Sequence, residues 1–143
     1  MCRRGMRPCD ERELRRIGCV DPYLALWNSV QASDIAIAAY TPRGVACLLG
    51  VCRPSLLSAG AANIWLLAHP DIERYSVRFL KECRRVLALL LARYGRLENH
   101  IDADNVKTIA WLEWLGFTVE KTRIVMSPMG FPFHHFWKEA PSV

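Results

Sequence analysis

The sequence predicts a single α+β domain of 143 residues, built on a mixed sheet with helices on both faces. Apolar residues recur at helical spacing over residues 72–94, between two short apolar strands at 63–68 and 97–101. A long helix between two such strands is the crossover that parallel strands require. Residues 105–115 predict a second amphipathic helix, which ends at Gly116 and runs into a β-branched stretch.

Two short helices are expected before the first strand. Acidic residues open the first at Asp10, and Asp21-Pro22 places a proline at the first helical position of the second. The inner face of the second helix is expected to consist of Leu24, Trp27 and Val30. Residues 1–8 are expected to form a loose basic terminus.

Four apolar segments bounded by turn residues predict further strands. Ile35–Tyr40 and Val45–Cys52 flank a Thr-Pro-Arg-Gly turn and are expected to form an antiparallel hairpin. Phe117–Met126 and Phe131–Trp137 are expected to be the last two strands. The predicted order is therefore α-α-β-β-β-α-β-α-β-β.

The helix at 105–115 has clear ends and faces. Asp104 is expected to cap its start, and Gly116 to end it in the left-handed conformation. Its apolar stripe consists of Ile109, Leu112 and Leu115. Trp111 and Trp114 are three residues apart, and at least one is expected to be partly exposed at a contact surface.

The composition narrows the class of protein. Apolar residues make up 52% of the chain, which argues against disorder. No run of eighteen apolar residues occurs, and no apolar segment follows the basic start, so we expect neither a membrane span nor a signal peptide. The net charge of +5 permits an anionic partner, but the N-terminal arginines lack interleaved aromatics, so a nucleic acid is not expected. The six cysteines form no CxxC pair, so no metal site is expected.

The order of elements and the Leu-Gly-Phe end of the helix at 105–115 resemble the GNAT acetyltransferase fold over nearly the whole chain. The resemblance implies that the strands at 63–68 and 97–101 are parallel and splay apart. It also implies that acetyl-CoA lies in the gap between them and that its acetyl group is transferred to an amine.

A narrower resemblance, over residues 63–119, is to the small GNAT-like proteins of short-tailed bacteriophages, often labelled internal virion protein A. It is carried by Ile64-Trp65, His69-Pro70, Ile72-Glu73-Arg74, Phe79-Leu80, Asn99, Asp102-Ala103 and Trp111–Phe117. This resemblance implies a protein of the host bacterial cytoplasm that can be packaged in the virion. Its implied partners are a phage structural protein, a host protein or a second copy of the chain.

The cofactor-binding positions depart from the family pattern. In GNAT proteins the pyrophosphate rests on backbone N–H groups of a glycine-containing loop before the long helix. The matching positions fall at Arg74, Ser76 and Arg78, and residues 61–94 contain no glycine. Larger side chains crowd the anion, whereas the two arginines could contact phosphate directly. Asn105 could hydrogen-bond the pantetheine arm of acetyl-CoA, or cap its helix.

The catalytic positions are also incomplete. The family often has a tyrosine, as general acid, seven residues after the helix-opening Asn, and this chain has Leu112 there. Leucine cannot transfer a proton, which removes a factor of roughly 10²–10⁴ in rate. Candidate bases are His69, Glu98 and His100. His69 follows the central strand and could instead make a structural hydrogen bond, while Glu98 and His100 share a strand face that could point to the cleft or to solvent.

Two classes of function stay open on this sequence. The first is an N-acetyltransferase that moves an acetyl group from acetyl-CoA to an amine. The second is a GNAT-like scaffold for virion assembly or host interaction with weakened or lost chemistry. The missing glycines and Leu112 favour the scaffold, whereas Asn105, the His69-Pro70 pair and the basic helix start favour the enzyme.

Overall fold

The computed structural model describes residues 5–54 and 61–142. Its elements, in chain order, are α1 (Pro8–Arg16), α2 (Pro22–Ala32), β1 (Ile35–Thr41), β2 (Gly44–Cys52), β3 (Ala62–Ala68), the 3-10 helix η2 (Pro70–Tyr75), α3 (Ser76–Tyr94), β4 (Arg96–Asp102), α4 (Val106–Trp114), β5 (Thr118–Val119), β6 (Val125–Met126) and β7 (Pro132–Glu139). Over these described residues one sheet of seven strands runs in the order β1-β2-β3-β4-β7-β5, with β6 also paired to β7. The predicted α+β mixed sheet is confirmed.

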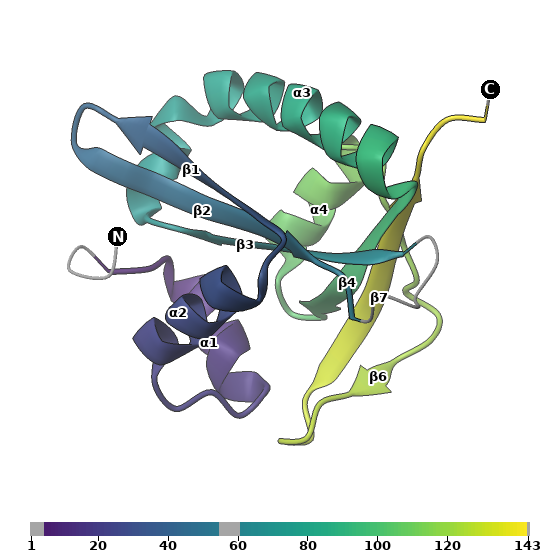
Figure 1. Cartoon of the computed structure of the whole chain (residues 1–143). Helices are drawn as coiled ribbons and strands as arrows, with labels where there is room; N and C mark the ends of the chain where they lie inside the picture. The colour runs from purple at the N-terminus through teal and green to yellow at the C-terminus, as the bar shows by residue number, and fades with distance from the viewer. Residues whose placement is uncertain (1–4, 55–60, 143) are drawn as a thin grey trace.

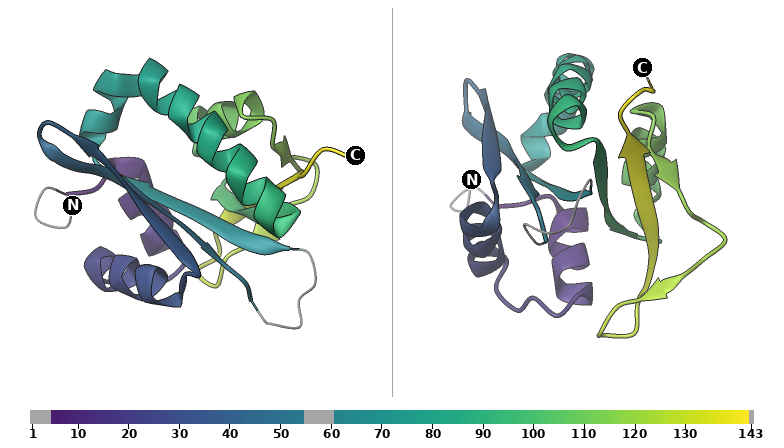
Figure 2. Two further views of the ribbon diagram at one scale, coloured as in Figure 1. Left: turned by 45° about the horizontal axis from the view of Figure 1, so that its top comes forward. Right: turned by 45° about the vertical axis from the view of Figure 1, so that its right-hand side comes forward.

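The parallel strands β3 and β4 pair at one end only. Their register joins Ala62 with Leu97 and Asn63 with Glu98, and the described residues continue it no further. β4 keeps its antiparallel partner β7 along its whole length, from Arg96 to Asp102. The sheet therefore opens between β3 and β4 toward their C-terminal ends, and its two halves turn away from each other (Figure 2). The expected splayed parallel pair is confirmed.

Helices cover both faces of the sheet. The pair α3 and α4 lies over one face, and α1 and α2 lie over the other (Figure 1). The main core lies between the first pair and the sheet, because the apolar stripes of both helices point there. The predicted stripe of α4 is confirmed: Ile109, Leu112 and Leu115 are all buried.

The described part of the N-terminus is packed rather than loose. The side chain of Met6 is buried. The backbone N–H of Arg7 donates to the carbonyl oxygen of Ala68 at 2.8 Å, at the open end of β3. Residues 1–4, the other part of the terminus expected to be loose, lie outside the described residues.

The predicted inner face of α2 is wrong. Leu24 is 56% exposed and Trp27 is 63% exposed, whereas Leu26 is buried. The helix is rotated from the expected position because a polar contact ties it to the sheet: the indole N–H of Trp65 on β3 donates to the hydroxyl of Ser33, the C-cap of α2, at 2.8 Å. The proline start with Asp21 as N-cap is confirmed.

Three local predictions also need correction. Asn105 rather than Asp104 caps α4, by accepting the N–H of Thr108 at 3.4 Å, because Asp104 is held by Arg16 at 2.7 Å. The helix predicted for 72–94 begins as η2 and becomes α-helical at Ser76. The single strand predicted for 117–126 is two short strands, β5 and β6.

Candidate active site

A cleft of about 530 Å³ lies where β3 and β4 separate. Its walls come from α1, the two strands, α4 and the segment that contains β6. The side-chain amide of Asn99 on β4 donates to the carbonyl oxygen of Ile64 on β3 at 2.7 Å, just beyond the last backbone pair. This bond satisfies the first unpaired carbonyl of the splayed strand, so it helps to hold the closed end of the cleft.

A buried ion pair fixes the start of α1 against the open end of β3. Asp10 is 6% exposed and accepts two hydrogen bonds from the guanidinium of Arg7, at 3.0 and 2.9 Å. The same carboxylate accepts the backbone N–H of Ala68 at 2.9 Å. Its charge is therefore fully engaged, and its role is to position α1 at the cleft.

A second buried carboxylate joins α1 to the end of β4. Asp102 is fully buried and accepts hydrogen bonds from Arg16 at 2.8 and 3.0 Å, while Arg12 lies at 3.7 Å. Neither the periodicity nor the spacing of the sequence indicated this long-range contact. Asp102 therefore engages two arginines of α1, Arg12 and Arg16.

Glu13 is the residue of this cleft that the sequence analysis missed. It stands three positions after Asp10, hence on the same side of α1, and lines the cleft. Burial is the main reason that its pKa is raised to about 7, and the charges of Asp10 and Asp102 raise it further. Hydrogen bonds from the backbone N–H of Asp102, at 3.4 Å, and from Asn105 oppose the shift. Because the nearby arginines serve Asp10 and Asp102, no ion pair to Glu13 is seen among the described residues.

The three predicted bases lie apart. His100 lines the cleft and packs at a tilt against His135, with ring centroids 5.2 Å apart, and burial is the main reason that its pKa is lowered. Glu98 shares its strand face but lies outside the cleft wall, held by Arg96 at 3.1 Å and by His135 at 3.3 Å. His69 caps η2, where its Nδ1 accepts the N–H of Asp71 at 3.1 Å. The structure thus places His100 and Glu13 on the wall of the same cleft, and gives His69 the structural hydrogen bond that the sequence left as its alternative.

The predicted phosphate-binding residues lie at the end of η2 and the start of α3. Arg74, Ser76 and Arg78 are all exposed, and none lines the cleft. Beside η2 a groove of about 420 Å³ runs between the starts of α1 and α4, and Asn105 lines both the groove and the cleft. The groove and the cleft therefore meet at Asn105.

The pyrophosphate does not fit this loop in the GNAT manner. Pro70 has no N–H, the N–H of Asp71 donates to the ring of His69, and that of Ile72 donates to the carbonyl of His69 at 3.1 Å. The first amides of η2 are therefore already used, and Arg74, Ser76 and Arg78 place side chains where the family pattern has glycines. Glu73 adds a carboxylate to the groove wall.

A pantetheine arm would meet a more favourable surface. Beyond Asn63, the edge of β3 that faces β4 has no strand partner in the described part of the chain, and residues 64–67 line the cleft. An extended amide-containing chain can hydrogen-bond to such an edge. Asn105, at the junction of cleft and groove, is 5% exposed and already caps α4.

The residue at position 112 is a leucine and cannot act as the general acid that the family often has there. Leu112 is buried and packs in the core below the cleft. Across residues 5–54 and 61–142 there is no group of three or more His, Cys, Asp or Glu side chains that could hold a metal ion. Within the same ranges, no helix is long and apolar enough to cross a membrane.

Comparison with known proteins identifies the fold. No family model and no curated protein sequence matches the chain. Among solved structures, a putative phosphinothricin N-acetyltransferase superposes with a TM-score of 0.63 at 13% identity, covering 94% of this chain and 90% of that one. The ribosomal-protein-S18-alanine N-acetyltransferase from Escherichia coli gives 0.59 at 15% identity, covering 95% and 88%.

An acetyltransferase of the GNAT family from Streptococcus pneumoniae gives a TM-score of 0.60 at 10% identity, covering 82% of this chain and 74% of that one. The chain therefore has the GNAT fold. At such low identities the likeness establishes the fold alone, and the chemistry must be argued from the cleft itself.

Proposed function

We propose that this chain is a GNAT-fold acyltransferase that moves an acyl group from a pantetheine thioester to an amine, with Glu13 as the general base. The observation that supports it is the Glu13 carboxyl, with its pKa raised to about 7, on the wall of the cleft between the splayed strands. A carboxylate in ordinary solvent is too weak a base to deprotonate an amine near neutral pH, and burial corrects that weakness.

The chemistry would need only one proton acceptor in the cleft. The amine nitrogen attacks the thioester carbonyl carbon, the new C–N bond forms, and the C–S bond breaks. Glu13 takes the proton that the amine loses. Leu112 has no proton to give, so water would protonate the departing thiolate, and we expect slow turnover.

Acetyl-CoA is expected to be a weak donor, because residues 61–94 contain no glycine and the first amides of η2 are already engaged. Most of the donor's affinity would come from its pantetheine arm near Asn105 and along residues 65–67 of β3, between the Asn99 contact to Ile64 and the Arg7 and Asp10 contacts to Ala68. Arg74 and Arg78 would supply whatever phosphate contact exists, since long basic side chains can reach an anion without a backbone cradle.

One pair of titrations tests the proposal. Calorimetry with acetyl-CoA and with acetyl-pantetheine should give weak affinities for both donors, and acetyl-CoA should bind more tightly only by what Arg74 and Arg78 contribute. Release of thiol should then depend on added amine and fall at least tenfold in Glu13→Gln, with Glu11→Gln on the same helix as the control. If neither donor binds at millimolar concentration, acyl transfer is excluded.

A second candidate function is a contact role in a bacteriophage, in virion assembly or in binding a host protein. It is favoured by Trp114, whose side chain is 46% exposed on α4, in the part of the chain that carries the phage resemblance. This function places the chain in the host bacterial cytoplasm or in the particle. Mass spectrometry of purified particles tests the second location, and co-purification with a phage or host protein tests the contact.

A further inference from the structure

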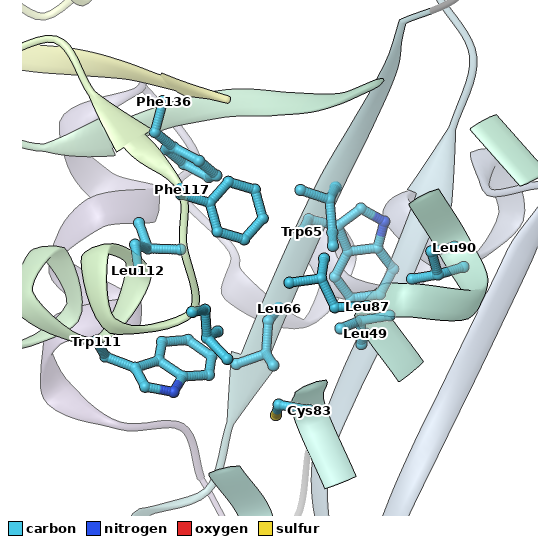
Figure 3. Close-up of a pocket in the computed structure, with 12 residues that line it drawn as sticks. Leu49, Trp65, Leu66, Cys83, Leu87, Leu90, Trp111, Leu112, Phe117 and Phe136 are labelled. Carbon is cyan, nitrogen blue, oxygen red and sulfur yellow. The ribbon is translucent and has the colours of Figure 1, made fainter. Parts of the chain in front are cut away.

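A small apolar cavity of about 70 Å³ lies beneath the cleft, between the sheet and the helices α3 and α4. Figure 3 shows side chains from several elements directed toward this space: Leu66 from β3, Leu87 from α3, Leu112 from α4, and the rings of Phe117 and Phe136. The side chains that line it are leucine, isoleucine, tryptophan, phenylalanine and cysteine, so none contributes an oxygen atom. Such a lining offers a water molecule few hydrogen-bond partners.

The cavity adjoins the cleft through a common wall. Ile64, Leu66, Trp111, Leu112 and Phe136 line both spaces. Leu112, which replaces the tyrosine expected from the family pattern, is one of them. A group attached to a ligand in the cleft could therefore enter the cavity by small rotations of apolar side chains, without crossing polar surface.

The wall also holds an unused donor. The indole nitrogen of Trp111 is buried and has no hydrogen-bond partner among the described residues. Buried polar groups are nearly always paired, and close packing leaves few voids larger than a water molecule in protein interiors. The apolar lining of the space favours an apolar group there, and the indole N–H of Trp111 could pair only with a polar atom of the same ligand.

We propose that this cavity receives the end of the acyl chain, so that the preferred donor carries a short acyl chain of about four carbons rather than acetyl. This inference rests on the proposed acyl transfer. The cavity volume corresponds to about two water-sized groups, given roughly 30 Å³ for each. Two methylene-sized groups beyond an acetyl group would fill it. Each buried methylene is worth about three- to fourfold in affinity, so two of them should make butanoyl exceed acetyl by roughly tenfold.

The test is a calorimetric series with acetyl-, butanoyl- and octanoyl-pantetheine on the full chain. We expect butanoyl to bind about tenfold more tightly than acetyl, and octanoyl to bind less tightly than butanoyl because its chain exceeds the cavity. Equal affinities for acetyl and butanoyl would overturn the inference and leave acyl transfer intact. If no thioester of any length binds, the proposed function fails together with it.

Matched variants on α3 test whether the acyl chain lies in the cavity. Leu87→Phe should fill the cavity and abolish the preference for butanoyl, while leaving acetyl-pantetheine binding unchanged. Leu89→Phe, at a position 73% exposed on the same helix, should keep the preference. Cys83→Leu should fill the cavity from another position in its wall. This variant replaces Leu87→Phe in the test if the Leu87→Phe protein does not fold. A butanoyl preference that survives a folded cavity-filling variant places the acyl chain elsewhere.

Discussion

Glu73 of η2 and Lys107 of α4 are joined by an ion pair of 2.7 Å between their side chains. Both residues line the groove that leads to the cleft. The contact lowers the pKa of Glu73, chiefly through the hydrogen bond from Lys107, so the carboxylate stays charged at neutral pH. The ion pair keeps a negative charge in the groove through which we propose that the phosphates of a CoA donor are bound. It also engages Lys107, a cation that could otherwise bind these phosphates.

We therefore expect Glu73→Gln to raise the affinity for acetyl-CoA severalfold, because it removes a repulsion and releases Lys107. Binding of acetyl-pantetheine, which has no phosphate, should not change. Glu82→Gln is the matched control, because Glu82 forms a similar exposed pair with Arg85 on α3. Calorimetry on the three proteins measures the difference, and an equal gain with acetyl-pantetheine would show that the groove is not the phosphate path.

The two exposed arginines near the start of α3 allow a complementary prediction. Any preference for acetyl-CoA over acetyl-pantetheine should disappear in the Arg74→Ala/Arg78→Ala double variant. A single Arg78→Ala change should lower acetyl-CoA binding by about 1.5–3 kcal/mol if its guanidinium contacts phosphate. Micromolar binding of acetyl-CoA to the double variant would contradict this account. Arg85→Ala, further along the same helix, controls for the general loss of positive charge.

Glu13 should make folding stability depend on pH. Its pKa is raised in the folded state, from an ordinary value of 4.5 to about 7. The folded chain thus holds this proton more tightly than the unfolded chain does. The resulting stabilisation is fully present below about pH 4.5 and is lost as the pH rises through 7. The loss attributable to Glu13 is at most about 3 kcal/mol.

Denaturant unfolding at pH 5 and pH 8 measures this effect. Glu13→Gln should remove the part of the difference due to Glu13 and be more stable than the original chain at pH 8. Glu11→Gln, whose carboxylate forms a surface pair with Arg15, should leave the difference unchanged. Unaltered pH dependence in Glu13→Gln would mean that the carboxyl titrates normally.

Trp114 should act in association rather than in folding. Its ring is 46% exposed and carries the guanidinium of Arg84 at 3.6 Å, whereas Trp111 packs against the core and stacks on Phe79. Trp114→Ala is expected to shift the thermal midpoint little and to weaken contact with a second copy or a partner. Sedimentation and co-purification measure the contact.

Trp111→Ala is the comparison for the same helix. It should destabilise the fold by roughly 3 kcal/mol, because it empties part of the core wall. A Trp114→Ala protein that unfolds, or that associates unchanged, would remove the support for a contact surface on α4.

The sequence by itself determined most of the fold. The long apolar stripe between two strands, the hairpin turn and the glycine end of α4 are local patterns, and each produced an element close to its expected bounds. The order of these elements then led to the parallel pair, because a helical crossover between neighbouring strands admits few arrangements, and the resemblance to the GNAT fold implied its splay. The departures at residues 74–78 and at Leu112 were likewise visible in the chain, since both concern which residue type is present.

Only the tertiary structure decided the chemistry of the cleft. The pKa of Glu13 depends on burial and on two carboxylates, one of them 89 residues away at Asp102. The rotation of α2 depends on the contact between Trp65 and Ser33. The capping of α4 by Asn105 depends on the pairing of Asp104 with Arg16. Local spacing shows which side chains share a face, but a desolvated charge, an ion pair across the sheet and an unfilled cavity are set by where distant segments meet.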